Sequence, residues 1–386
     1  MEVGSWIRRM FEEGIAMKKK YGDENVYDLS LGNPVMEPPP EFKQAIKDLA
    51  DHPFKGMHGY MENAGYPQTR DAIAEQLRKE TGVNITGNSI IMSVGAAGAI
   101  NVALKTILNP GDEVIVFIPW FVDYFNYVEN HDGVVKPLPT DENFLPKLDV
   151  LEANIGPKTR AILMDSPNNP TGVVYTADLM AKMADILRRK EAEYGHDIYI
   201  VSDEPYKKII YDGLTYPSPM SFYRHSLICA CHSKDLSIPG ERIGYVALHP
   251  DAKRHDDMIK GLVFCTRVLG FINAPAFMQN VVRRCQGVTI NVEEYQRHRD
   301  YIYNNLIRMG YTVNKPEGAF YIFPKSPIPD DVAFVHELQN EHRVLTVPGV
   351  AFGTPGYFRL VYCVDDDLLE KCMPGLEAMA KKYGLS

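Results

Sequence analysis

The chain has 386 residues, of which 45% are hydrophobic and 24% are charged, and its formal net charge is -9. This length and composition are typical of a globular protein with a large core, and they argue against disorder, collagen-like repeats and coiled coil. The net negative charge argues against chain-wide attraction to nucleic acid or to an anionic membrane, so we expect neither as a partner.

The six cysteines, at 229, 231, 265, 285, 363 and 372, form no C-x-x-C pair and no spacing typical of zinc. We therefore expect reduced thiols, no bound metal and a cytoplasmic protein. The N-terminus mixes basic and acidic residues, unlike a signal peptide. The most apolar long window, 90–104, is interrupted by polar residues and is too short to span a bilayer.

Residues 1–27 have a charged amphipathic helical pattern, and the prolines of the segment that follows predict an extended connector. Buried strands are predicted where short runs are apolar on both faces, at 89–94, 113–118, 161–164, 198–201, 227–230 and 243–248. Helical patterns at 96–108 and 178–190 lie between them. This alternation predicts an α/β domain with a mainly parallel sheet.

The end of the chain has a different pattern. From about residue 291 a helical pattern is followed by strand-like runs at 318–323 and 358–362, which predict a smaller α+β unit. We therefore expect a large domain at 46–285 and a small domain built from residues 1–45 and 286–386.

Polar or glycine-rich clusters follow four of the predicted strands: Gly95–Gly98, Asn168–Gly172, Ser202–Tyr206 and Ser233–Lys234. Ligands bind outside the carboxyl ends of strands in open α/β sheets, so these clusters are expected to converge on one pocket. The motifs G-x-G-x-x-G, G-x-x-x-x-G-K-[ST], H-E-x-x-H and G-x-S-x-G are absent from the sequence. Their absence weakens a dinucleotide enzyme, a P-loop ATPase and a simple serine hydrolase as hypotheses.

The first cluster is a candidate anion site. Gly95, Ala96 and Ala97 are small, and the helix that starts here offers free N–H groups and its positive dipole end. The alternative is a tight turn without a ligand. Arg242 follows a Pro-Gly turn and is able to give a bidentate phosphate contact, with a surface salt bridge as its alternative.

Asp203 and Lys234 each follow a buried apolar run. A carboxylate at the edge of a core needs a cationic partner, for which a Lys or Arg is the simple solution. Desolvation lowers the pKa of a lysine and frees its amine to form an imine. An acid, a lysine and a phosphate cup at one sheet edge are what pyridoxal 5'-phosphate requires.

The string from Ser233 to Tyr245, S-K-D-L-S-I-P-G-E-R-I-G-Y, resembles the lysine signature of the class I and II aminotransferases, the aspartate aminotransferase family of fold type I. The segments 168–172 and 202–206 resemble its N-P-T-G and S-D-E-x-Y segments, and 110–114 and 60–65 match as well. The resemblance runs in order from about residue 28 to 362. It implies a large domain with a mainly parallel, seven-stranded sheet, a smaller α+β domain, and transfer of an amino group between an amino acid and a 2-oxo acid.

The resemblance also implies roles for single residues. Lys234 is expected to hold pyridoxal 5'-phosphate as an imine and then to shuttle a proton. Asp203 is expected to keep the pyridine nitrogen protonated, while Asn169 and Tyr206 contact the phenolic oxygen of the ring. Phe121 matches the aromatic residue that stacks on the ring, and Trp120 is the neighbouring alternative.

The resemblance also implies contacts with the phosphate group of the cofactor and with a partner subunit. The amides of Ala96 and Ala97 in the turn that begins at Gly95, with Ser233 and Arg242, are implied to bind the phosphate. Cys231 stands where many relatives have Ser or Thr, and Ser233 is the expected substitute donor. Tyr60 matches a tyrosine that reaches the phosphate of the partner subunit, which implies a homodimer with shared active sites.

Gly32 and Arg359 match the pair that binds the α-carboxylate of the substrate, next to Asn169. The alternative for Arg359 is an exposed strand arginine. Arg267 lies near where some relatives place a partner-subunit arginine for a second carboxylate, so aspartate or glutamate is the expected amino donor.

Two other functions stay open at this stage. A lyase that eliminates at the β or γ carbon has the same fold, and some such enzymes share S-K-D-L-x-x-P-G. A non-enzymatic cofactor-binding regulator would carry a basic DNA-binding domain, and residues 1–27 are too short and too mixed in charge for one.

Overall fold

The larger body of the protein is built on a seven-stranded sheet with the strand order β2-β8-β7-β6-β5-β3-β4. The computed structural model describes residues 6–385. Strands β4, β3, β5, β6 and β7 run parallel, whereas β8 is antiparallel to both of its neighbours, which confirms the mainly parallel sheet. The strands are β2 (Ile90–Ser93), β3 (Glu113–Ile118), β4 (Val134–Pro139), β5 (Thr159–Asp165), β6 (Tyr199–Asp203), β7 (Ser226–Cys231) and β8 (Gly244–Leu248).

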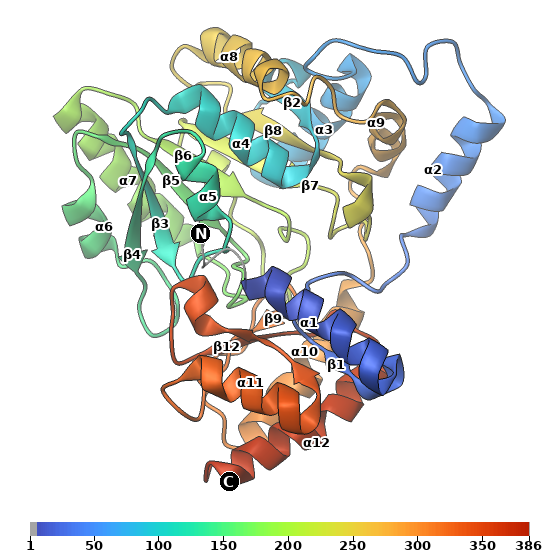
Figure 1. Cartoon of the computed structure of the whole chain (residues 1–386). Coiled ribbons are helices and arrows are strands. Elements are labelled where there is room, and N and C mark those ends of the chain that lie inside the picture. The colour runs from blue at the N-terminus through green and yellow to red at the C-terminus, as the bar shows by residue number, and fades with distance from the viewer. Residues whose placement is uncertain (1–5, 386) are drawn as a thin grey trace.

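Helices cover both faces of this sheet (Figure 1). In β5, Ala161 and Leu163 pack into one hydrophobic core, while Ile162 and Met164 pack into another on the opposite face. Burial on both sides explains why the strand sequences are continuously apolar. The helices of the first face are α4 (Gly95–Ile107), α5 (Tyr124–Glu129) and α8 (His255–Val268). Those of the second are α2 (Pro40–Asp51), α3 (Pro67–Thr81), α6 (Leu148–Asn154), α7 (Ala177–Tyr194) and α9 (Ala276–Val282).

The smaller body joins the two ends of the chain. Strand β1 (Tyr27–Asp28) pairs in parallel with β10 (Val344–Leu345), so the N-terminal segment packs with the C-terminal elements. A three-stranded antiparallel sheet has the order β11-β12-β9. Its strands are β11 (Val347–Pro348), β12 (Phe358–Val361) and β9 (Tyr321–Ile322), and the helices are α1 (Trp6–Tyr21), α10 (Val292–Arg308), α11 (Asp331–His342) and α12 (Asp366–Lys382).

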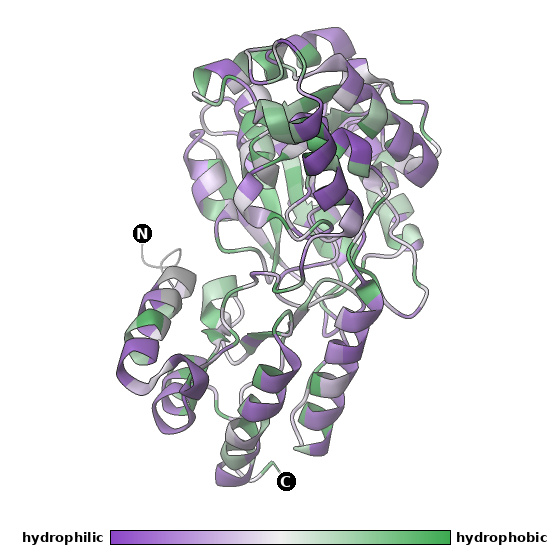
Figure 2. Cartoon of the chain, turned by 90° about the vertical axis from the view of Figure 1, so that its right-hand side faces the viewer, coloured by the Kyte–Doolittle hydropathy of each residue, from purple (hydrophilic) through white to green (hydrophobic). Residues whose placement is uncertain are grey.

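Hydropathy follows this architecture. Figure 2 shows hydrophobic strands in the middle of the larger body and hydrophilic faces on the surrounding helices. No helix within residues 6–385 has both the length and the apolar character needed to cross a membrane. Short 3-10 helices occupy Asp23–Asn25, Gly87–Ser89, Pro219–Ser221, Pro239–Glu241, Arg283–Cys285 and Gly349–Phe352.

Two predicted elements differ in extent from the structure, and one strand was not predicted. The helical pattern at 1–27 becomes α1, and residues 1–5 lie outside the described residues. The run at 318–323 contains only the short strand β9, because its first residues form a turn. Strand β4 was not predicted, since it is an edge strand with two prolines and a partly exposed surface.

Candidate active site

A cavity of about 670 Å³ opens at the carboxyl ends of β5, β6 and β7, beside the start of α4. The smaller body closes one side of it with residues from the segment after β1, from β9 and from β12. Most of the site residues predicted from the sequence line this cavity: Gly32, Ala96, Ala97, Phe121, Asn169, Asp203, Tyr206, Ser233, Lys234, Arg242 and Arg359. The convergence of the four strand-end clusters is therefore observed.

Lys234 places an amine inside the cavity. Its Nζ donates a hydrogen bond of 2.6 Å to the carbonyl oxygen of Gly32 and lies 5.4 Å from the ring centroid of Phe320. Burial disfavours the ammonium form and lowers the pKa of Lys234 below its ordinary value. A desolvated amine of this kind is a competent nucleophile toward a carbonyl group.

Asp203 is a buried carboxyl group with one free oxygen. Its Oδ2 accepts a hydrogen bond of 2.9 Å from the hydroxyl of Tyr124, whereas Oδ1 has no hydrogen-bond partner among the described residues. No described Lys or Arg forms an ion pair with Asp203. The basic partner that the sequence suggested for this carboxyl group is therefore not found. Burial raises the pKa of Asp203 to about 7. A cationic N–H group in the cavity would satisfy Oδ1 and stabilise the ionised form.

Arg359 is buried, with 2% of its surface exposed, so the exposed-strand alternative is wrong. Its Nη1 donates a hydrogen bond of 2.9 Å to Oδ1 of Asn169, and its Nη2 donates to the carbonyl oxygen of Ser30. The guanidinium carbon lies 4.7 Å from the ring centroid of Tyr321. The Nε of Arg359 has no partner among the described residues, which leaves a buried donor for an anionic ligand.

The turn at the start of α4 forms a cradle for an anion. Gly95 has a φ of +85°, and a Cβ atom at this position would lie 2.8 Å from Nη2 of Arg242. The guanidinium of Arg242 donates to the carbonyl oxygens of Pro239 at 3.0 Å and Val94 at 3.4 Å. Arg242 therefore lies at the helix start, where backbone N–H groups and the helix dipole already favour negative charge.

Of the two aromatic residues predicted as alternatives from the sequence, Phe121 lines the cavity and Trp120 does not. Phe121 lines the cavity and packs edge-to-face on Tyr124, with ring centroids 5.6 Å apart. Trp120 is buried instead against Phe125, with ring centroids 4.9 Å apart.

Asp165 and Tyr321 were missed by the sequence analysis. Asp165 accepts hydrogen bonds of 2.8 Å from the backbone N–H of Asn169 and from the side chain of Asn168, and so orients that loop. Burial raises the pKa of Asp165 to about 8. Asp165 directly follows a predicted strand, the signal that identified Asp203, and could have been found in the same way. The hydroxyl groups of Tyr321 and Tyr206 lie 2.6 Å apart.

Tyr60 and Arg267 do not line the cavity of their own chain. Tyr60 is 93% exposed, and Arg267 is exposed in the last turn of α8. Their segments are joined by a 2.9 Å hydrogen bond from Nδ2 of Asn63 to the carbonyl oxygen of Ile272. Asn273 donates in return to the carbonyl oxygen of Glu62 at 3.0 Å. The two predicted partner contacts therefore belong to neighbouring segments of one surface.

Comparison with known proteins gives consistent results. The family model described as "Aminotransferase class I and II" matches residues 24–374. A probable aspartate aminotransferase of Methanocaldococcus jannaschii is 34% identical, with 90% of this chain and 91% of the relative covered. An aromatic-amino-acid aminotransferase of Thermococcus litoralis is 32% identical over 99% of this chain and 97% of its own. A crystal structure of an aminotransferase from Eubacterium rectale superposes with a TM-score of 0.94 at 37% identity, covering 98% of this chain and 95% of the other.

The cavity, with its desolvated lysine, its half-satisfied aspartate and its buried arginine, agrees with these comparisons. The sequence resemblance and the mainly parallel α/β fold are thereby both confirmed. The chain belongs to the class I and II aminotransferases, enzymes that transfer an amino group between an amino acid and a 2-oxo acid.

Proposed function

We propose that this aminotransferase works with pyridoxal 5'-phosphate held in the cavity between Lys234 and Asp203. The observation that carries the proposal is the buried Oδ1 of Asp203, which lacks a partner in a cavity that also contains the Lys234 amine. When bound, this cofactor supplies an aldehyde that accepts the amino group and a ring that withdraws electrons from the substrate α-carbon.

Each residue around the cofactor ring then has a proposed role. Lys234 would hold the cofactor through its Nζ and would move a proton at that atom during amino transfer. Asp203 holds a proton on the ring nitrogen, and Tyr124 fixes its carboxylate through their 2.9 Å hydrogen bond. Asn169 and Tyr206 donate to the phenolic oxygen of the ring. Phe121 covers one face of the ring.

The phosphate fits the cradle at the start of α4. Gly95, Ala96 and Ala97 present backbone N–H groups there, and Arg242 lies against Gly95. Ser233 also lines the cavity and supplies a hydroxyl donor, whereas Cys231 gives a weaker one. These donors fix the cofactor without taking part in the bond changes.

Arg359 is proposed to bind the α-carboxylate of the substrate. Its unpartnered Nε is the donor that the carboxylate would engage, and Asn169 keeps the guanidinium in place. Gly32 allows the approach, because a Cβ atom at this position would lie 2.2 Å from the hydroxyl oxygen of Tyr321. With the carboxylate held there, the α-carbon faces Lys234, and the smaller body shields it from water.

The enzyme is further proposed to be a homodimer with shared sites and a preference for aspartate or glutamate. Tyr60 and Arg267 lie outside their own cavity and on joined segments, so both are available to a second subunit. Exposed apolar side chains surround Arg267: Phe264 at 59%, Val268 at 54% and Ile272 at 41% exposure. Such a patch favours an interface between subunits. The name of the Methanocaldococcus jannaschii relative is consistent with an acidic donor.

Two organisational proposals accompany these. The predicted large domain, 46–285, is proposed to extend back to the start of α2 at Pro40, because Phe42 and Ala45 pack in one core with residues of α3 and α9. The small domain then contains the remaining N-terminal segment and residues 286–386.

A cytoplasmic location is supported by six cysteines that are all free and buried, as expected in a reducing compartment.

A half-reaction screen tests the cofactor and the donor together. The protein loaded with pyridoxal 5'-phosphate is mixed with each amino acid in turn, and the visible spectrum of the cofactor is followed. Aspartate or glutamate should bleach the imine absorbance fastest. Borohydride reduction and peptide mapping should then place the label on Lys234. Labelling of another lysine, or a spectrum that no amino acid changes, would refute the proposal.

A further inference from the structure

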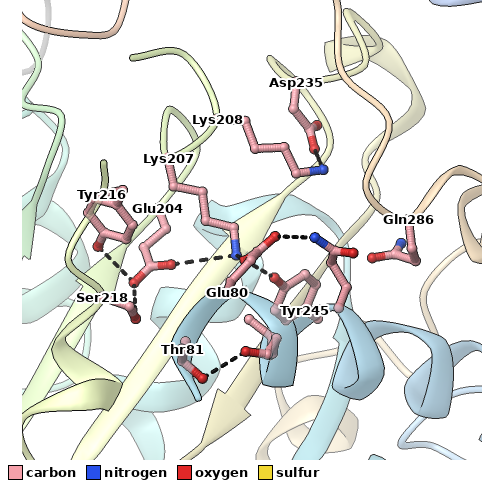
Figure 3. A network of polar contacts seen from close by, with 12 residues as sticks. Glu80, Thr81, Glu204, Lys207, Lys208, Tyr216, Ser218, Asp235, Tyr245 and Gln286 are labelled. Carbon is pink, nitrogen blue, oxygen red and sulfur yellow. Dashed lines mark hydrogen bonds and ion pairs between the residues drawn. The ribbon is translucent and has the colours of Figure 1, made fainter. Parts of the chain in front are cut away.

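A partly buried polar network shares a wall with the active-site cavity. Figure 3 shows Glu80, Glu204, Lys207, Lys208 and Asp235 among its members. Pro205 and Cys231 line both the main cavity and a space of about 10 Å³ inside this network, so the two share a wall. Glu204 and Asp235 directly follow Asp203 and Lys234 in the sequence. The network therefore contains the residue that directly follows each of these two key residues, and it shares a wall with the cavity.

One part of the network is an ion pair between the two segments that carry the key residues (Figure 3). Nζ of Lys208 lies 2.9 Å from Oδ2 of Asp235, and their side chains are only 15% and 8% exposed. Lys208 also donates to the carbonyl oxygen of Val288 at 3.1 Å. His232 contacts the same Oδ2 of Asp235 at 3.2 Å. Burial alone would raise the pKa of Asp235, but the charges of Lys208 and His232 hold it well below its usual range.

A second contact anchors the preceding residue. Nζ of Lys207 lies 2.8 Å from Oε2 of Glu80 on α3, 3.2 Å from the hydroxyl of Tyr245 on β8, and 3.8 Å from Oε2 of Glu204. Glu204 is 2% exposed, and burial raises its pKa. Lys207 thus holds the segment after β6 against α3 and β8, and it partly balances the carboxylate beside Asp203.

The Lys208–Asp235 contact lies beyond the end of the sheet ladder. Backbone pairing between β6 and β7 reaches Asp203 and Cys229, and the N–H of Glu204 donates to the carbonyl oxygen of Cys229. Within residues 6–385, no backbone hydrogen bond joins 205–208 to 232–235. The side-chain ion pair therefore connects the two segments at the point where Tyr206 and Lys234 enter the cavity.

We propose that Lys208 is a positioning residue for amino transfer: through Asp235 it fixes the segment bearing Lys234 against the segment bearing Asp203 and Tyr206. This inference rests on the proposed use of Lys234 and Asp203 on either side of one cofactor. Neither Lys208 nor Asp235 lines the cavity. Their effect is to hold two reactive groups at a constant separation, and small misplacements of reacting groups reduce rates strongly.

The test compares Lys208→Met, Asp235→Asn, their double variant and Lys208→Arg with the wild-type holoenzyme. Lys136→Met is the matched control, because Lys136 forms an ion pair with Glu113 between β3 and β4, away from the cavity. Lys208→Met should lower kcat by about tenfold, change KM by less than about threefold, and speed release of the cofactor by about tenfold. Lys208→Arg should recover most of the wild-type kcat, and the double variant should lose little more than the worse single variant.

The pH at which the cofactor spectrum titrates separates positioning from general destabilisation. Loss of Lys208 leaves the charge of Asp235 unbalanced near Lys234 and should raise the midpoint, whereas Asp235→Asn should lower it. If Lys208→Met matches Lys136→Met in kcat, cofactor release and midpoint while only its melting temperature falls, the pair is merely structural and the proposal is overturned. If Lys208→Met does not fold, Asp235→Asn and Lys208→Arg decide. If the wild-type enzyme transferred no amino group, the proposed function would be refuted instead. The rate of cofactor release and the pH midpoint of the cofactor spectrum would still test the role of the ion pair.

Discussion

The guanidinium of Arg359 on β12 donates a hydrogen bond of 2.9 Å to the side-chain oxygen of Asn169 in the loop after β5. These residues are far apart in the sequence and come from the two different bodies of the protein. The contact orients Arg359 toward the cavity and leaves Nδ2 of Asn169 as a donor for a ligand oxygen. One hydrogen bond therefore links the proposed carboxylate site to the proposed ring site.

Arg359→Lys should weaken binding of every amino acid and 2-oxo acid. Lysine keeps the charge but cannot contact Asn169, Ser30 and a carboxylate in the planar geometry of a guanidinium. We expect KM to rise by roughly 30-fold or more for all substrates, equivalent to about 2 kcal/mol, with a smaller effect on kcat. Steady-state kinetics with two unrelated amino acids measure this. An unchanged KM would place the α-carboxylate elsewhere.

Asp203→Asn should abolish electron withdrawal while keeping the cofactor bound. Asparagine preserves the shape and a hydrogen bond with Tyr124 but cannot hold a proton on the ring nitrogen. The single-turnover half-reaction should slow by about a hundredfold or more, which corresponds to roughly 2.7 kcal/mol or more of transition-state stabilisation. Tyr124→Phe removes only the supporting hydrogen bond and should cost less. Near-normal turnover in Asp203→Asn would show that this carboxylate is only structural.

The stability of the cofactor-free protein should fall as the pH rises from about 4 to 8. The pKa values of Asp203 and Asp165 in the native chain are about 7 and about 8, whereas an unfolded Asp titrates near 3.9. Between these values the native state holds protons that the unfolded state has released, so each group lowers the free energy of unfolding by about 1.4 kcal/mol per pH unit. Below the unfolded pKa and above the native pKa this contribution no longer changes with pH.

Thermal unfolding of the cofactor-free protein at pH 5.5, 7 and 8.5 measures this effect. Asp203→Asn removes one titrating group, so its melting temperature should depend less steeply on pH than that of the wild type. Bound cofactor offers Asp203 a counter-charge that lowers its pKa, so the stabilisation that it gives should increase as the pH rises toward 7 and level off above it. Parallel curves for the wild type and Asp203→Asn would contradict the buried, half-satisfied state of this carboxyl group.

The sequence predicted the part of the site that depends on short-range order. Lys234, Asp203 and Asn169 each follow a strand whose apolar run is visible in the sequence, and parallel strands bring their carboxyl ends to one edge. The buried state of Arg359 also agrees with its apolar neighbours. These inferences needed only local periodicity and a general rule of sheet topology.

Contacts between segments that are distant in the sequence could not be predicted from local patterns. The pairing of Tyr321 with Tyr206 and the hydrogen bond from Lys234 to the carbonyl oxygen of Gly32 depend on how the smaller body docks on the sheet. No local pattern encodes that docking. Strand β4 was missed because an edge strand lacks the burial on both faces that marks the central strands. The Lys208–Asp235 ion pair was missed because charged residues after a strand usually predict a solvated loop.

Arg267→Ala should harm acidic substrates selectively if the partner subunit's Arg267 reaches their distal carboxylate. Arg267 is exposed, lies outside its own cavity, and belongs to a segment joined to that of Tyr60. Truncating one partner of a desolvated arginine–carboxylate pair typically costs about 2 to 5 kcal/mol. The kcat/KM for aspartate and glutamate should therefore fall by roughly 30-fold or more, while that for alanine changes little.

Lys260→Ala, at an exposed position on the same helix, is the control and should leave both substrates unaffected. The assembly is measured in parallel by sedimentation, because an arginine that acts in trans requires a dimer. If Arg267 only supported its own helix, its loss would weaken all substrates equally through reduced stability. Equal losses for alanine and aspartate, or full activity in a monomer, would show that Arg267 does not select the substrate. A selective loss in an intact dimer would assign the acidic donor to this shared site.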